Sequence, residues 1–125
     1  MQSEGASPTG AQLPDLPPHV RDMLDEAVRR IVEIAHPRLV ILFGSYADGQ
    51  YHEGSDLDLL VVAETESWPR LGAELRQALH PVLGSLGLDL LVYPPADWER
   101  DRAVRGFVAR DADRRGVRIH ESPGR

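Results

Sequence analysis

The chain has 125 residues, and its 20 Asp and Glu outnumber its 14 basic residues, which gives a formal net charge of −6. All 14 basic residues are arginines and cysteine is absent, so disulfides, thiol nucleophiles, Cys-ligated metal sites and lysine chemistry are excluded. The acid surplus argues against a protein that holds nucleic acid or an anionic membrane by bulk charge.

The first part of the chain predicts a tail followed by a helix. Residues 1–14 are rich in Ser, Gly, Pro and Gln, show no apolar period and are expected to form a flexible tail. They lack the features of a signal peptide, and no run of about 20 apolar residues is present, so a cytoplasmic protein is expected. Over residues 20–34, apolar side chains recur at helical spacing, which predicts an amphipathic helix ending before Pro37.

Two strands follow, joined by a short polar segment. Leu39–Phe43 is a continuous apolar run stopped by Gly44, a pattern typical of a strand buried on both faces. Residues 45–55 are polar, with a short helical turn expected near Tyr46, and residues 56–63 predict the second strand. The connection of about a dozen residues is short for a full helical crossover and long for a tight hairpin.

The second half of the chain alternates helix and strand. The apolar spacing predicts a helix over residues 69–83, a strand over Leu88–Tyr93, a helix over residues 96–114 and a short edge strand over residues 117–120. This order predicts an α/β (α+β) fold, with a small mixed β-sheet of three to four strands flanked by helices. We expect one domain over residues 15–121, between tails at 1–14 and 122–125.

Two carboxylates open the second predicted strand, at Asp56 and Asp58. Side chains two residues apart on a strand point to the same face, so both acids share one side while Leu57 and Leu59 enter the core on the other. Two carboxylates this close repel each other unless a cation lies between them, and a hard ion such as Mg²⁺ or Mn²⁺ meets that need. The alternative is a pair of solvated acids on an exposed strand edge.

Gly44 and Ser45 end the first strand with a residue that has no Cβ, followed by a hydroxyl. Backbone N–H groups at such a turn can approach an anion closely, and a phosphate there is favoured by the unpaired N–H groups and the local dipole. Gly-Ser after a strand is also common as a simple turn. Followed about ten residues later by Asp56 and Asp58, it predicts a phosphate cradle beside a metal pair, since nucleoside triphosphates arrive as metal complexes.

A third acid, Asp89, is embedded in the apolar strand Leu88–Tyr93. A lone acid in such a run is costly to bury without a partner or a metal; the alternative is an exposed position at the start of the strand, after Gly87. Opposite Asp56 and Asp58, Asp89 would complete a two-metal site, in which one ion binds the triphosphate and the other activates an attacking hydroxyl.

Residues 42–45 (Leu-Phe-Gly-Ser) and 55–61 (Ser-Asp-Leu-Asp-Leu-Leu-Val) resemble the signature of the DNA polymerase beta-like nucleotidyltransferase superfamily. The signature is an apolar residue, Gly-Ser, a spacer, and then Asp-x-Asp between apolar positions. The strand Leu88–Tyr93 and residues 116–119 resemble the minimal nucleotidyltransferase (MNT) group. The resemblance covers residues 20–121 and implies this superfamily's fold and a nucleotidyltransferase activity.

The resemblance also implies a role for each candidate residue. Gly44 and Ser45 would hold the β- and γ-phosphates of ATP or another nucleoside triphosphate. Asp56 and Asp58 would bind both of two Mg²⁺ ions, with Mn²⁺ as the alternative. Asp89 would bind only the catalytic ion, where it would help to deprotonate the acceptor hydroxyl.

One position departs from the resemblance. Many family members carry a basic residue where this chain has Asp48. A phosphate contact is then either missing or supplied by one of the arginines, which leaves the nucleotide preference and the turnover rate open.

The acceptor of the nucleotide is expected on another molecule. Larger relatives carry an additional acceptor-binding domain, for which a single domain leaves no residues, and an acidic domain is a poor candidate for holding DNA or RNA alone. Minimal members are commonly encoded beside a HEPN partner, form a toxin–antitoxin pair with it, and transfer AMP to one of its tyrosines. The resemblance therefore favours an antitoxin that adenylylates a HEPN toxin. The alternatives are a non-catalytic antitoxin that masks its partner and a stand-alone transferase acting on a small hydroxylated molecule.

Overall fold

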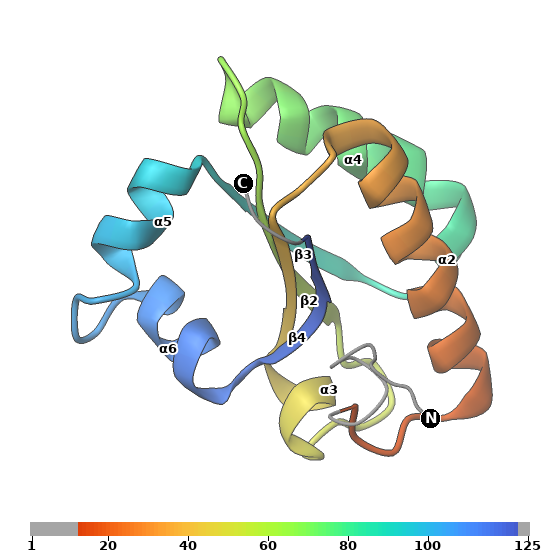
Figure 1. The fold of residues 1–125 in the computed structure, drawn as a ribbon. Coiled ribbons are helices and arrows are strands. Elements are labelled where there is room, and N and C mark those ends of the chain that lie inside the picture. Colours follow the sequence, from red (N-terminus) through yellow and green to blue (C-terminus); the bar gives the residue numbers. More distant parts are fainter. Residues whose placement is uncertain (1–12, 123–125) are drawn as a thin grey trace, which may run out of the picture.

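The computed structural model describes residues 13–122 (Figure 1). Residues 1–12 and 123–125, which include most of the expected tails, lie outside the described residues. Within the described part, Leu13 is half-buried against the hydrophobic core. The elements in chain order are helix α2 (Pro18–Ala35), strand β1 (Leu39–Phe43), helix α3 (Ser45–Asp48), strand β2 (Leu57–Val62), helix α4 (Trp68–Leu83), strand β3 (Leu88–Tyr93), helix α5 (Pro95–Asp101), helix α6 (Val108–Arg115) and strand β4 (Val117–Glu121).

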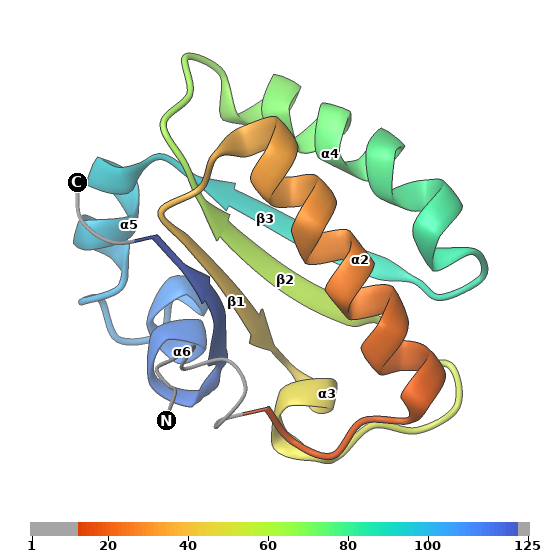
Figure 2. The same cartoon turned by 45° about the vertical axis from the view of Figure 1, so that its right-hand side comes forward.

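The strands of the described residues form one mixed sheet with the order β3-β2-β1-β4 (Figure 2). β1 is antiparallel to both of its neighbours, β2 and β4, whereas β2 and β3 run parallel. The crossover helix α4 joins the parallel pair, as parallel strands require. The shorter connection from β1 to β2 passes through α3 and returns the chain antiparallel. The mixed sheet flanked by helices that the sequence predicts is confirmed.

Helices cover both faces of the sheet (Figure 1). α2 and α4 pack side by side on one face, and α5 and α6 lie on the other. The cluster under α2 and α4 includes Val20, Leu24, Ile31, Leu57, Leu59, Leu75, Leu79 and Leu90. The cluster under α5 and α6 contains Leu39, Ile41, Phe43, Leu60, Val62, Trp98, Ala109 and Ala112. β1 contributes to both clusters and is buried throughout, as predicted. None of the helices within residues 13–122 is long and apolar enough to cross a bilayer.

Helix α2 forms where the apolar period predicts it. Its buried face repeats every three or four residues, the spacing that places side chains on one side of a helix. The helix ends before Pro37, where His36 takes a left-handed φ of 46° and its N–H donates to the Val32 carbonyl at 3.0 Å. The buried residues are Val20, Leu24, Ala27 and Ile31.

The single helix expected over residues 96–114 is wrong, because the structure divides this segment into α5 and α6. The two helices are separated by a loop over residues 102–107. Gly106 in that loop has a φ of 92°, a conformation that other residues rarely adopt, and it interrupts the helix. The division allows each short helix to pack on the sheet, α5 through Trp98 and α6 through Ala109.

Candidate active site

Asp58 of β2 and Asp89 of β3 lie directly opposite each other in the parallel pairing. A backbone hydrogen bond from the Leu57 N–H to the Gly87 carbonyl, at 2.8 Å, fixes the register at this end. Asp56 immediately precedes β2 and lies at the same end of the sheet. The topology thus brings the three predicted acids to the amino ends of β2 and β3, beside the end of β1.

The carboxylate of Asp58 faces the side of the sheet that carries α5 and α6. Along β2, Asp58 alternates with Leu57 and Leu59, which are buried under α2 and α4. It shares its face with Leu60 and with Phe43, the residue opposite it on β1. This burial pattern confirms the expected division for Asp58 and its neighbours Leu57 and Leu59, whereas Asp56 precedes the strand.

Burial and neighbouring acids raise the pKa of Asp58 from 3.8 to about 6. Desolvation of the half-buried carboxyl is the largest cause, followed by the negative charges of Asp89 and then of Asp56. A hydrogen bond between the Asp58 and Asp89 side chains adds to the shift, because it needs a proton on one of the two carboxyls. A cation bound at this edge of the sheet would favour the ionised form of Asp58.

Asp89 is exposed, although it lies in a strand of buried and half-buried residues. Asp89 therefore does not incur the cost of burying a lone acid. Of the two alternatives that the sequence leaves open for this residue, the structure shows the exposed position near the start of the strand. Its relation to Asp58 comes from the strand register and not from burial.

Gly44 ends β1 with a φ of 74° and a ψ of −156°, and α3 begins directly after it at Ser45. A Cβ on Gly44 would lie 2.0 Å from Asp58 Oδ2, so only glycine leaves room for the carboxylate in this place. The N–H groups of Ser45 and Tyr46, in the first turn of α3, have no acceptor within the helix. The helical turn expected near Tyr46 is confirmed, and Gly44 lies against the carboxylate of Asp58.

Gly87 also belongs to the site, which the sequence motifs do not indicate. A Cβ on Gly87 would lie 2.1 Å from Asp56 Oδ1, and its carbonyl accepts the N–H of Leu57. Gly87 therefore pairs with the start of β2 and leaves room for the Asp56 carboxylate. The signal that could have revealed it is a glycine two residues before Asp89, at the entrance to the neighbouring strand.

A tight turn delivers Asp56 to the start of β2. Ser55 is buried, its Oγ accepts a hydrogen bond from the His52 N–H at 2.8 Å, and its own N–H donates to the His52 carbonyl at 2.9 Å. Gly54 supplies the φ of 93° within this turn. Asp48, further back in the same connection, is exposed and accepts a backbone N–H of that segment at 3.0 Å.

The donor set suits a hard divalent cation. Asp56, Asp58 and Asp89 offer only carboxylate oxygens, which Mg²⁺ and Mn²⁺ prefer as ligands. Gly44 and Gly87 keep space free at two of these carboxylates. Within residues 13–122, no three acid or histidine side chains already converge as a complete set of metal ligands. The three acids thus fit such an ion by type and by position, and their side chains would have to turn toward it.

Comparison with known families matches residues 22–117 to the nucleotidyltransferase domain. Among solved structures, the chain is similar to a toxin–antitoxin complex with AMP-PNP, at 22% identity and a TM-score of 0.57, over 82% of this chain and 73% of that chain. It is also similar to a mutant of the toxin–antitoxin MntA-HpeT, at 22% identity and a TM-score of 0.57, over 87% and 76% of the two chains. A protein from Sulfolobus solfataricus, provisionally assigned as a nucleotidyltransferase, has 18% identity and a TM-score of 0.55 over 97% and 93%. No curated protein matches the chain.

The comparisons and the geometry agree on one family. At 18% to 22% identity, the solved structures establish the fold. The family match runs from within α2 to the start of β4, and so includes the Gly44 turn and all three acids. The chain therefore belongs to the nucleotidyltransferase domain family and is a nucleotidyltransferase.

Proposed function

We propose that the chain is a metal-dependent adenylyltransferase that moves AMP from ATP to a tyrosine of a HEPN-type toxin and thereby acts as its antitoxin. The observation that carries the proposal is the opposition of Asp58 and Asp89 on adjacent parallel strands, with Asp56 two residues before Asp58. The family match supports nucleotidyl transfer. The likeness in fold to proteins of toxin–antitoxin complexes, one of them with AMP-PNP, supports the choice of nucleotide and partner.

Each residue of the site has a part in this proposal. Asp56, Asp58 and Asp89 would hold two Mg²⁺ ions, or Mn²⁺, which when bound supply positive charge to the triphosphate and lower the pKa of the acceptor hydroxyl. Gly44 and Ser45 would hold the β- and γ-phosphates through backbone N–H groups at the start of α3.

The reaction forms one bond and breaks another. The acceptor oxygen attacks the α-phosphorus of ATP, the bond from that phosphorus to the oxygen bridging to the β-phosphate breaks, and pyrophosphate leaves. The hydroxyl proton passes to the Asp89 carboxylate, the most exposed of the β2 and β3 acids, and then to solvent. Asp58 is largely ionised at neutral pH, because its raised pKa of about 6 still lies below that pH.

Transfer of a label tests the proposal. The purified chain is incubated with Mg²⁺, ATP labelled at the α-phosphate and the product of the adjacent gene, and we expect label on a tyrosine of that product. Asp58→Asn removes the charge opposite Asp89 and should abolish transfer. Glu66→Gln changes an exposed acid outside the site and should transfer like the wild type. If the wild-type chain transfers no label with Mg²⁺ and none with Mn²⁺, the proposal is contradicted.

The same reagents separate the two alternative functions. If Asp56→Ala and Asp58→Ala leave neutralisation of the partner unchanged, the chain acts by masking its partner. If the chain transfers the nucleotide to a small hydroxylated compound with no protein acceptor present, it is a stand-alone transferase. Either result contradicts the proposed protein adenylylation.

A further inference from the structure

The positive charge of this acidic chain is concentrated in one segment. Residues 102–118 hold six arginines and two aspartates, a formal charge of +4, so the other residues together carry −10 within the net −6. Besides Arg102 at the start of the loop, four of these arginines lie on that loop and on α6. They are Arg105, Arg110, Arg114 and Arg115.

The same segment exposes apolar side chains. Phe107 is 47% exposed, Val108 43% and Val104 36%. Among the large apolar side chains of residues 13–122, Trp68 is the one other that is comparably exposed. Exposed apolar side chains beside arginines are typical of contact surfaces between proteins.

A groove of about 660 Å³ crosses this region, and Asp111 is the one acid in its lining. Gly106, with its φ of 92° and no neighbour within 4 Å of a Cβ built on it, turns the loop in open space. We call the region the α6 surface. Its members are Arg105, Phe107, Val108, Arg110, Arg114 and Arg115.

The arginines of the α6 surface are largely unused within the protein. Arg105 and Arg114 have no ion-pair partner among residues 13–122. Arg115 Nε lies 3.7 Å from Asp111 Oδ1, and both side chains are mostly exposed, so this pair contributes little to stability. These cations remain available to a partner.

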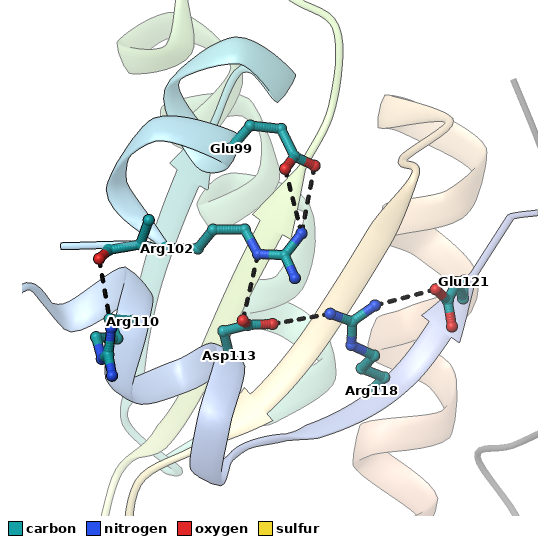
Figure 3. Close-up of polar contacts among 7 residues, drawn as sticks. Glu99, Arg102, Arg110, Asp113, Arg118 and Glu121 are labelled. Carbon is teal, nitrogen blue, oxygen red and sulfur yellow. Dashed lines mark hydrogen bonds and ion pairs between the residues drawn. The ribbon is translucent and has the colours of Figure 1, made fainter. Parts of the chain in front are cut away.

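Two neighbouring arginines have a structural role instead (Figure 3). Asp113 lies between them and accepts from Arg102 Nε at 3.2 Å and from Arg118 Nη2 at 2.8 Å. Glu99 and Glu121 bind the outer sides of these guanidinium groups. This network joins α5, α6 and β4, and it holds the α6 surface in place without using its exposed cations.

We propose that the α6 surface binds an acidic segment of a protein partner, one in which Asp or Glu residues flank an apolar side chain. The carboxylates of the partner pair with Arg105, Arg114 and Arg115, and its apolar side chain covers Phe107 and Val108. Arginine and aromatic side chains in this combination carry much of the binding energy at protein interfaces. The proposal rests on the proposed function only for the choice of partner, which is the product of the adjacent gene.

A nucleic acid fits the α6 surface less well. Phe107 and Val108 offer nothing to a phosphate backbone, which is bound through cations and hydrogen-bond donors. The charge of −10 on the rest of the chain repels an extended polyanion wherever it leaves the surface, within a screening length of about 8 Å at physiological salt. A protein partner can be acidic locally and neutral elsewhere.

The position of α6 relates this surface to the reaction. α6 packs through Ala109 and Ala112 on the face of the sheet toward which Asp58 points. A partner bound on the outer side of α6 therefore stands on the same side of the sheet as the Asp58 carboxylate. The α6 surface would position a protein acceptor, while the three acids act on it.

Calorimetric binding of the adjacent gene's product, without ATP, tests the proposal independently of transfer. Arg114→Glu with Arg115→Glu should weaken binding roughly 10- to 100-fold, because two attractive charges become repulsive. Phe107→Ser should weaken it roughly tenfold, through loss of the apolar contact. The replaced side chains are all exposed, so each variant should remain folded at the temperature of the binding assay.

Matched controls separate this surface from general effects of charge. Arg21→Glu with Arg70→Glu makes the same change in net charge at exposed positions on α2 and α4. Trp68→Ser removes the exposed aromatic side chain of α4. Both controls should bind the partner like the wild type, and losses equal to those of the α6 variants would overturn the proposal.

A photo-crosslink from p-benzoylphenylalanine at position 107 identifies what lies on the surface. It should map to an acidic segment of the partner, and charge reversal there should restore binding to the variant with Arg114→Glu and Arg115→Glu. No binding by the wild type, or a crosslink to a segment without acids, overturns the proposal. The proposal is also overturned if the wild type binds a labelled RNA, or associates with itself in sedimentation, and the variant with Arg114→Glu and Arg115→Glu does not. Binding as expected without any label transfer supports the surface and contradicts only the proposed transfer.

Discussion

Gly87 and Asp56 occupy complementary space where β2 and β3 begin: a Cβ on Gly87 would lie 2.1 Å from Asp56 Oδ1. The φ of Gly87 is not positive, so its backbone conformation does not require glycine. The position that the Asp56 carboxylate takes in this structure requires it. The site thus determines the identity of Gly87, although glycine has no reactive side chain.

Gly87→Ala should displace the Asp56 carboxylate and lower kcat/KM for nucleotidyl transfer roughly 100-fold, the scale expected for a misplaced reacting group. The measurement is label transfer at saturating Mg²⁺. Gly84→Ala is the control, because its φ of 59° is strained for alanine while its surroundings are open. That control should cost about 1–3 kcal/mol of stability and keep its activity per folded molecule. Equal loss of activity in both variants would show that instability, and not displacement of Asp56, is the cause.

The metal-free protein should lose stability through Asp58 as the pH rises from 3.8 to about 6. The raised pKa means that the folded state binds this proton more tightly than the unfolded state. The cost of ionising Asp58 in the folded protein is therefore absent below pH 3.8 and complete above about pH 6. Asp58→Asn should therefore raise the free energy of unfolding near neutral pH by about 1 kcal/mol, after allowance for solvent screening. Urea unfolding in EDTA over this pH range measures it, and a variant less stable than the wild type near neutral pH would contradict the expectation.

Mg²⁺ should stabilise the wild-type chain, and EDTA should reverse the effect. An ion at a concentration tenfold above its Kd stabilises by about 1.4 kcal/mol when it binds only the folded state. Asp89→Asn removes one of the proposed ligands and should reduce the Mg²⁺-dependent rise in Tm. If this variant gains as much as the wild type, the ion binds elsewhere on the chain.

Asp113→Ala should destabilise the protein by about 2 kcal/mol, because it leaves two partly buried guanidinium groups side by side without the acid between them. Its side chain is 16% exposed and contacts Arg102 and Arg118 (Figure 3). Asp111→Ala removes a 63% exposed acid from the same helix and should cost less than about 0.5 kcal/mol. Urea unfolding of both variants measures the difference, and similar losses would contradict the structural role of Asp113.

Trp98→Ala should cost about 3–5 kcal/mol of stability, the range for truncating a buried aromatic side chain. Trp98 is 3% exposed, lies edge-on to Tyr93 with ring centroids 6.2 Å apart, and has the Arg102 guanidinium 5.7 Å from its ring. Trp68→Ala is the matched control, because that ring is 54% exposed. Thermal unfolding should separate the two by more than 10 °C, on the scale of about 4–8 °C per kcal/mol for a chain near this size.

Local patterns predict the features of this fold that depend on neighbouring residues. The continuous apolar run identifies β1, which is buried on both faces, and the helical period identifies α2, which is buried along one side. Both patterns can be recognised from residues close together in the sequence. The alternation of Asp58 with Leu57 and Leu59 between the two faces of β2 follows from the two-residue period of a strand.

Features that depend on distant residues are not predicted in this way. The opposition of Asp58 and Asp89 depends on the register between strands that a whole helix separates. Trp68 and Trp98 both lie near a proline at the start of a helix. Trp98 is buried, because it packs between α5 and the sheet, whereas Trp68 of α4 is exposed. The division between α5 and α6 depends on the positive φ of Gly106, which competes with a high helix propensity on either side.

The place of β3 in the sheet determines the order in which this site assembles. Gly44, Asp56 and Asp58 lie on β1, β2 and their short connection, which pair antiparallel through contacts that are close in sequence. Asp89 arrives on β3, which among the described residues pairs only with β2 and does so across the α4 crossover. Pairing over this separation is expected to form later than the β1–β2 pairing, because more loop-closure entropy has to be overcome. We therefore expect Asp89 to join the site after Gly44, Asp56 and Asp58, and a chain that has not yet paired β3 with β2 does not hold the three acids together.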